Sequence, residues 1–122
     1  MKAEVKSITS PDIVNFTNYF PEDETTFAFL MQIIVGIKGE KGGDSFNIEV
    51  CTPKWLLENN NSDDIIFGRH KLIVFEYNIE RIIKLITKHC ESCEGNNWEE
   101  IANKIARIAL WEFEDYQINS IR

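Results

Sequence analysis

The sequence predicts an α+β fold, in which an antiparallel β-sheet of three to five strands carries two C-terminal helices packed on one face. Segments with the apolar patterns of strands come first, and two segments with helical periodicity follow them. That order is typical of α+β rather than alternating α/β architecture. The length of 122 residues and the hydrophobic content of 43% suit one globular domain, which we expect to span residues 1–122.

Four strand-like segments precede the two long helices. The first, 2–10, alternates small or apolar residues with charged ones and ends at the turn-forming SPD sequence. The segment 26–38 is apolar on both faces, which predicts a central strand. The glycine-rich GEKGGD sequence, 39–44, predicts a hairpin connection to 45–51, where apolar and polar residues alternate. The segment 69–77 is predicted to be a further long strand.

Capping residues and apolar stripes mark the helices. Thr52 is a good N-cap and Pro53 suits a first helical position, so 52–59 is predicted to form a short helical turn. The apolar spacing predicts a helix that begins at Ile79 and is stopped by Gly95. Asn97 caps the last helix, whose apolar stripe consists of Trp98, Ile101, Ala102, Ile105, Ala106 and Ala109.

The sequence WEFEDY, residues 111–116, combines three aromatic side chains with three carboxylates near the end of the chain. If the last helix reaches Tyr116, Phe113 and Tyr116 continue its core stripe and Glu112 lies inside that stripe. Glu112 is then a structural, partly buried carboxylate that needs a partner, because an unpaired buried charge is costly. The candidate partners are Arg69, His70 and Arg81.

The same helix would turn the other WEFEDY side chains outward. Trp111, Glu114 and Asp115 would form an exposed indole surrounded by carboxylates, a mixture typical of interfaces with basic partners. The alternative is a helix that ends near Leu110, after which Trp111 folds back against the edge of the sheet.

The three cysteines do not form a recognisable metal or disulfide framework. Cys90 and Cys93 form a C-x-x-C sequence, but a zinc ribbon needs a second pair, and Cys51 stands alone. The pair lies at the end of a helix, where the helix dipole opposes thiolates, and on its apolar stripe. We therefore expect buried, reduced thiols, no metal and no cofactor.

No arrangement of residues predicts catalysis. His70 and Glu76 lie six residues apart on one predicted strand, which separates them by roughly 20 Å. The sequence has no nucleophile elbow and no glycine loop that begins a helix and could hold phosphate. We expect no catalytic residues and no enzymatic activity.

The acidic composition narrows the class of partner. A net charge of −7 and an isoelectric point near 4.8 argue against nucleic acid or an anionic membrane and suit a basic protein. The acidic loops at Glu22, Asp23 and Glu24 and at Asp63 and Asp64 are either solvated surface or patches that steer a partner. The polar start of the chain and the lack of a long apolar run predict a cytoplasmic protein.

Four sequences together resemble the immunity protein 8 family of bacterial polymorphic toxin systems: SPD (10–12), SFNIEVCTPKWL (45–56), GRHKLIVFEYN (68–78) and WEFEDY (111–116). The resemblance covers nearly the whole chain. It implies a cytosolic antidote that binds and neutralises the C-terminal domain of a secreted or contact-delivered toxin, one to one. Many such toxins are nucleases with basic active-site clefts, so the resemblance implies that the antidote covers such a cleft.

Two hypotheses about the site follow. As an antidote, the protein is predicted to contact the toxin through Trp111, Glu114, Asp115, Glu22, Asp23, Glu24, Asp63 and Asp64. The alternative is a small-molecule-binding domain or small enzyme, with a sheet–helix pocket around Glu112 and His70.

Overall fold

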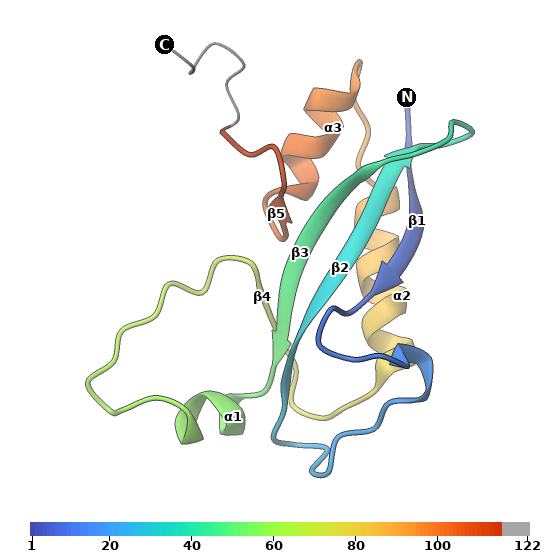
Figure 1. The fold of residues 1–122 in the computed structure, drawn as a ribbon. Coiled ribbons are helices and arrows are strands. Elements are labelled where there is room, and N and C mark those ends of the chain that lie inside the picture. The colour runs from blue at the N-terminus through green and yellow to red at the C-terminus, as the bar shows by residue number, and fades with distance from the viewer. Residues whose placement is uncertain (116–122) are drawn as a thin grey trace.

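In the computed structural model, which describes residues 1–115, a five-stranded sheet is covered on one face by two long helices (Figure 1). This architecture confirms the predicted α+β class. The strands are β1 (Ala3–Thr9), β2 (Ala28–Ile37), β3 (Asp44–Cys51), β4 (Lys71–Ile73) and β5 (Leu110–Trp111). The helices are η1 (Phe16–Asn18, one 3₁₀ turn), α1 (Pro53–Glu58), α2 (Ile79–Glu91) and α3 (Trp98–Ile105).

Strand β3 organises the sheet. Its first edge pairs antiparallel with β2, which pairs antiparallel with β1. Its second edge is shared: β5 pairs antiparallel near the start of β3, at Phe46 and Asn47, and β4 pairs parallel near its end, from Glu49 to Cys51. The two ends of β3 are therefore completed by different parts of the chain.

The predicted strand 69–77 is much shorter than expected, and its direction differs from the antiparallel prediction. Only Lys71–Ile73 forms β4, which runs parallel to β3. His70 has a positive φ of 65°, so the chain turns immediately before the strand. After it, the backbone N–H of Tyr77 donates to the Glu24 carbonyl (2.8 Å), which joins the segment between β4 and α2 to the 20–25 loop.

The core lies between the sheet and the helices α2 and α3. Alternate residues of β3, Phe46 and Ile48 among them, point to this side and are buried, as the period of two predicts. The helices bury their apolar stripes against the same side, as predicted. Figure 1 shows α2 running behind the strands. The buried helical side chains include Ile82, Ile86, Cys90, Ile101, Ala102 and Ile105.

The hairpin between β2 and β3 confirms the role predicted for its glycines. Gly39 and Gly42 have φ angles of +87° and +82°, which side chains other than glycine rarely adopt. At Gly36, a Cβ atom would lie 2.2 Å from the Gly42 carbonyl oxygen, so the strand leaves no room for a side chain there.

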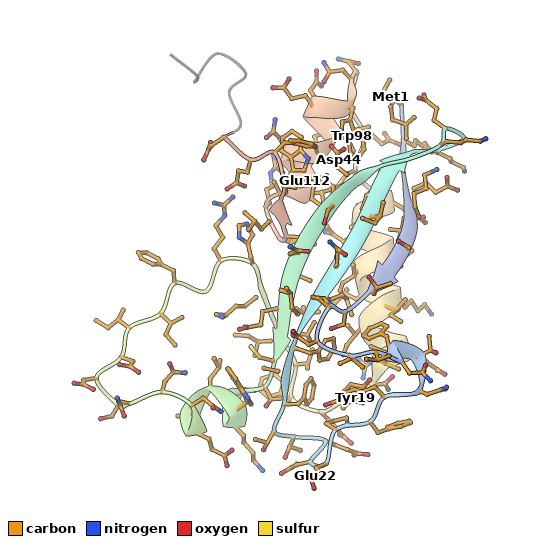
Figure 2. The ribbon with its side chains drawn as sticks, viewed as in Figure 1. Met1, Tyr19, Glu22, Asp44, Trp98 and Glu112 are labelled. Atoms are coloured by element: carbon orange, nitrogen blue, oxygen red, sulfur yellow. The ribbon has the colours of Figure 1, made fainter. Side chains whose placement is uncertain are left out.

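The Asp44 carboxylate, at the start of β3, connects α3 and β5 to the sheet by hydrogen bonds. Asp44 Oδ2 accepts hydrogen bonds from the indole Nε1 of Trp98 (2.6 Å) and of Trp111 (3.0 Å). The Trp111 ring also stacks on buried Phe46, with ring centroids 6.3 Å apart. Figure 2 shows Asp44 beside Trp98 at one end of the sheet. These contacts bind the final described segment to the first residues of β3.

The helix that was predicted to reach Tyr116 ends at Ile105. The chain then turns and enters β5, so the alternative in which Trp111 folds back on the sheet edge is confirmed. The prediction that Phe113 continues a buried stripe is wrong, because its side chain is 41% exposed. Tyr116 lies outside the described residues.

Replacing Asp44 by alanine removes the acceptor of two indole N–H groups at once. We expect a loss of about 2 kcal/mol in the free energy of unfolding, since each partly buried donor left without an acceptor costs roughly 1 kcal/mol or more. Urea unfolding measures the change, with Lys41→Ala at the exposed hairpin tip as the control. An Asp44→Ala protein as stable as this control would contradict the role of the carboxylate.

Candidate partner-binding surface

At the opposite end of the sheet from Asp44, α1 lies beside the 20–25 loop, and both segments carry exposed acidic and apolar side chains. The 59–70 loop leaves α1 at this end and returns toward β5, where Arg69 pairs with Glu114. Figure 2 places Glu22 at this end, far from Trp98 and Glu112. One loop, 20–25, lies between η1 and β2, and the other, 59–70, connects α1 to β4. Figure 1 shows the second loop projecting well away from the sheet. We call this surface, formed by 20–25 and 53–67, the acidic end.

Local capping builds α1 as the sequence predicts. The Thr52 hydroxyl accepts hydrogen bonds from the backbone N–H of Trp55 (3.2 Å) and of Phe27 (3.3 Å), so one side chain caps α1 and joins it to β2. At the other end of the helix, the Asn59 and Asn60 side-chain amides donate to carbonyls of the last turn. These bonds fix the point from which the 59–70 loop leaves.

Asp64 holds the start of that loop in shape. Its carboxylate accepts from the backbone N–H of Asn61 (2.8 Å), and its own N–H donates to the Asn61 carbonyl (3.0 Å). Such a turn orders the loop without contacts to the sheet. Asp63 makes no hydrogen bond or ion pair within residues 1–115, and its carboxylate faces solvent.

The residues after this turn are apolar and nearly fully exposed. Ile65 is 98% exposed and Phe67 is 95% exposed. Leu57 on α1 and Phe20 in the other loop are also exposed. Scattered apolar residues on a surface are common, but adjacent large apolar side chains on a projecting loop are typical of surfaces that bind a partner.

The 20–25 loop adjoins α1. The Asp23 carboxylate accepts from the Thr25 N–H and hydroxyl, both at 2.8 Å, and these hydrogen bonds hold the pKa of Asp23 below its usual range. The Lys54 ammonium group of α1 donates to the Thr25 hydroxyl (3.4 Å), which connects the loop to the helix. Asp23 therefore stays ionised on a surface shared with α1.

The acidic end holds much of the negative charge of the protein. The sequences 20–25 and 53–67 contain six carboxylates and one lysine, Lys54. The carboxylates belong to Glu22, Asp23, Glu24, Glu58, Asp63 and Asp64, and all six residues are exposed. Closely spaced charges of one sign create a local negative potential that attracts a basic partner.

The structure separates the predicted contact residues into two groups. Trp111, Glu114 and Asp115 lie at the other end of the sheet, and two of them have structural contacts. Trp111 is bound to Asp44, and Glu114 Oε1 forms an ion pair with Arg69 Nη2 at 2.5 Å. Asp115 adopts a positive φ of 60° in the turn that follows. Glu22, Asp23 and Glu24 lie in the 20–25 loop beside α1, and Asp63 and Asp64 lie in the 59–70 loop that leaves α1.

Glu112 has a structural contact, but the prediction that it is buried is wrong. Because α3 ends early, Glu112 lies beyond β5 on the exposed sheet edge. Its Oε1 accepts from the Ser45 N–H (2.9 Å), and its own N–H donates to the Ser45 carbonyl (3.0 Å). The side chain thus extends the pairing of β5 with β3. It bonds to none of the predicted partners.

The alternative pocket around Glu112 and His70 is not assembled. His70 Nε2 lies 3.3 Å from the Ala106 carbonyl oxygen, at a small pocket of about 290 Å³ that also borders His89 and Arg107. Glu112 does not line this pocket. The carboxylate and the imidazole therefore do not form a shared acid–base site.

Comparison with known protein families identifies the class of the chain. Residues 3–116 match the family described as Immunity protein 8. The chain belongs to the immunity protein 8 family. This immunity protein accordingly has a bacterial toxin as its partner. No significant match was found among the curated proteins or among the solved structures. Within residues 1–115, no helix of this immunity protein is long and apolar enough to cross a membrane.

The sequence prediction missed the apolar part of the candidate surface. It identified Asp63 and Asp64 but not Ile65, Phe67 or Leu57. The available signal was the apolar IIF sequence directly after SDD, in a segment with neither helical nor strand periodicity. Apolar residues that no regular element buries are candidates for contact with a partner.

The thiols of the immunity protein are buried as predicted. Burial raises the pKa of Cys90 to about 12, and it also raises the pKa values of Cys93 and Cys51 above the ordinary value. All three cysteines are free, and no group of three metal-ligating side chains forms among residues 1–115. The C-x-x-C pair therefore contributes to the core.

The raised thiol pKa values predict a stability that falls at alkaline pH. Well below the ordinary thiol pKa of about 8.5, thiols are protonated in both the folded and the unfolded state and contribute no pH dependence. As the pH rises through about 8.5, the thiols of the unfolded chain lose their protons while those of the folded chain keep them. The free energy of unfolding therefore decreases toward pH 12. In the folded protein near pH 8 we expect Ellman's reagent to leave Cys90 unmodified, and in urea to modify all three cysteines. Fast modification of folded Cys90 would contradict its burial.

Glu112 can be tested with two variants. Glu112→Gln keeps a side-chain oxygen for the Ser45 N–H, so we expect a change below about 0.5 kcal/mol in the free energy of unfolding. Glu112→Ala removes that acceptor, and a loss of about 1 kcal/mol is expected. Thermal or urea unfolding distinguishes the two. Equal stability of both variants would show that the hydrogen bond contributes nothing.

Proposed function

We propose that this immunity protein neutralises its toxin by docking the acidic end onto a basic, nuclease-like active-site cleft, in a one-to-one complex. The observation that carries the proposal is that exposed apolar side chains directly follow two exposed carboxylates in the projecting 59–70 loop, while three more exposed carboxylates lie in the 20–25 loop beside α1. Protein interfaces combine an apolar centre with charged surroundings in this way.

The apolar side chains supply affinity in this account. Ile65 and Phe67 are almost completely exposed, so burial against a partner removes most of their surface from water. Complete burial of a side chain of this kind contributes about 1.5–3 kcal/mol. Because Asp64 already orders the start of the loop, less conformational entropy is lost on binding than in a disordered segment.

In this proposal, the carboxylates raise the rate of association with the toxin and favour a basic partner over other proteins. A basic cleft and a negative surface attract each other before contact, which raises the association rate and makes it sensitive to salt. Exposed charges at the rim affect association more than dissociation. A cleft that binds nucleic-acid phosphates has the complementary charge.

Inhibition requires occupancy and no chemistry from the antidote. A loop that fills the cleft excludes the substrate for as long as the complex lasts, so a slow dissociation rate is the property that protects the cell. The reduced, buried thiols support a site of action in the cytoplasm, where an incoming toxin meets its target.

The test uses the C-terminal toxin domain of the protein encoded immediately upstream. Calorimetry of the two proteins should give tight one-to-one binding, with a dissociation constant on the order of 1 nM. Ile65→Ser with Phe67→Ser should weaken binding by roughly 100-fold or more, because two buried apolar side chains are lost. Val14→Ser, another fully exposed apolar position, is the matched control and should bind normally.

The contribution of the carboxylates is tested separately, through the association rate. Glu22→Lys with Asp63→Lys should lower the association rate, measured by stopped-flow mixing, by about 10-fold at low salt and less at high salt. Glu40→Lys with Glu99→Lys makes the same charge change away from the acidic end. Tight binding that survives both the apolar and the charge variants would place the toxin on another surface. The absence of any binding would remove the upstream toxin as the partner.

A further inference from the structure

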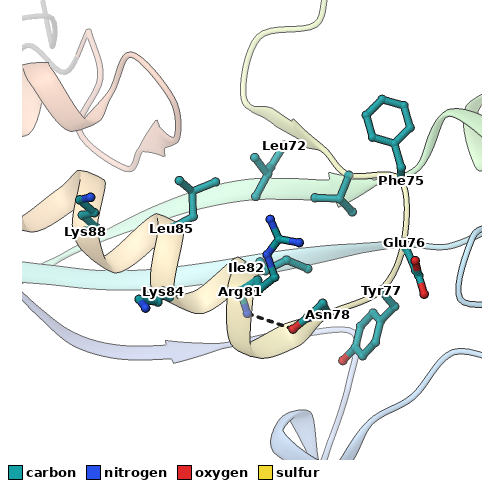
Figure 3. Close-up of a pocket in the computed structure, with 11 residues that line it drawn as sticks. Leu72, Phe75, Glu76, Tyr77, Asn78, Arg81, Ile82, Lys84, Leu85 and Lys88 are labelled. Carbon is teal, nitrogen blue, oxygen red and sulfur yellow. Dashed lines mark hydrogen bonds between the residues drawn. The ribbon is translucent and has the colours of Figure 1, made fainter.

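A groove of about 740 Å³ runs between α2 and the segment that continues from β4 to Asn78 (Figure 3). Leu72 of β4 and Leu85 of α2 lie on either side of it, and Arg81 extends from α2 toward the strand. The lining residues are Leu72, Val74, Phe75, Glu76, Tyr77, Asn78, Arg81, Ile82, Lys84, Leu85 and Lys88. Its floor is apolar and its rim is charged.

The rim is basic although the protein is acidic. Arg81, Lys84 and Lys88 all border the groove, and Glu76 is the carboxylate among the lining residues. None of the three cations takes part in an ion pair within residues 1–115. A net positive groove on a chain of charge −7 favours an occupant that carries carboxylates.

The groove also exposes large apolar side chains. Phe75 is 76% exposed and Leu85 is 55% exposed. Exposed apolar groups beside unpaired cations match a peptide segment that presents apolar anchors next to acidic residues. A purely polar anion would leave these side chains in water.

One segment of this same chain has that chemistry. The sequence SDDIIF, 62–67, carries two aspartates followed by three large apolar residues. In the structure, Ile65 and Phe67 are almost fully exposed, so the loop does not occupy the groove of its own chain. The acidic, apolar loop and the basic, apolar groove are both without a partner and complementary in charge.

We propose that the 62–67 loop of a second copy occupies this groove, so that the protein forms a homodimer by reciprocal exchange of loops. The loop leads directly into β4, and Leu72 of β4 lines the groove, so both features belong to the same edge of the sheet. A two-fold axis near this edge brings each loop to the other groove, and closed two-fold symmetry is the commonest arrangement of soluble dimers.

The expected dimer is weak. Two reciprocal insertions, each centred on one phenylalanine and one isoleucine, bury on the order of 1,000 Å² in total, at the low end of specific interfaces. A dissociation constant on the order of 10 μM follows for such an interface, with a clear dependence on salt. If the proposed function also holds, toxin and second copy compete for the same loop.

Sedimentation velocity of the full chain tests the proposal over concentrations from about 1 to 500 μM at low salt. We expect a reversible monomer–dimer equilibrium. Arg81→Glu with Lys84→Glu should raise the dimer dissociation constant at least about 10-fold. Both positions lie in the first half of α2, where glutamate suits the helix dipole, so folding is preserved. Lys38→Glu with Lys41→Glu at the exposed hairpin is the matched control and should dimerise normally.

A second set of variants exchanges the charges of the loop and the groove. Ser62→Lys with Asp63→Lys should also abolish the dimer, and it leaves Asp64 in place to hold the loop. Combining these two changes with Arg81→Glu and Lys84→Glu reverses both surfaces and should restore dimerisation. A protein that stays monomeric throughout, a dimer that survives Arg81→Glu with Lys84→Glu, or a combined variant that stays monomeric would each overturn the proposal. The groove variants leave the acidic end unchanged, so their binding to toxin tests the proposed function separately.

Discussion

The carboxylate of Asp44 joins three parts of the chain that would otherwise be held weakly. It lies at the start of β3 and accepts the indole N–H groups of Trp98 from α3 and Trp111 from β5. Strand β5 is only two residues long, so its own backbone pairing is too limited to hold the segment. The Asp44 hydrogen bonds and the stacking of Trp111 on Phe46 supply the missing stabilisation.

This constraint is one reason why the proposed toxin-binding surface excludes the Trp111 side chain. With Trp111 bound to Asp44 and Glu114 paired with Arg69, two of the side chains predicted to contact the toxin at the β5 end already have partners within the chain. In the 59–70 loop, by contrast, Ile65 and Phe67 contact little of their own chain. Substitutions in such a loop can change the choice of partner while the core keeps its packing. In the proposed mode of binding, stability and recognition are therefore carried by different segments of the chain.

Local sequence signals predicted the elements whose structure is decided locally. The β2–β3 hairpin, the Thr52 cap and the apolar stripe of α2 follow from residues close together in the chain. The length of β4 and the end of α3 could not be predicted from the neighbouring residues, because contacts with distant parts of the chain determine them. Tyr77 bonds to Glu24, and Trp111 bonds to an aspartate 67 residues earlier. For the site, charge patterning located the acidic loops, whereas the exposure of Ile65 and Phe67 required the structure.

The central claim is that the toxin docks on the acidic end and not on the WEFEDY segment. Hydrogen–deuterium exchange of the immunity protein, with and without its toxin domain, tests this claim most directly because it maps contact without altering the chain. Slower exchange in the complex should concentrate in residues 20–25 and 54–70, with 110–115 unchanged. Protection of 110–115 with free exchange of the 59–70 loop would contradict the account.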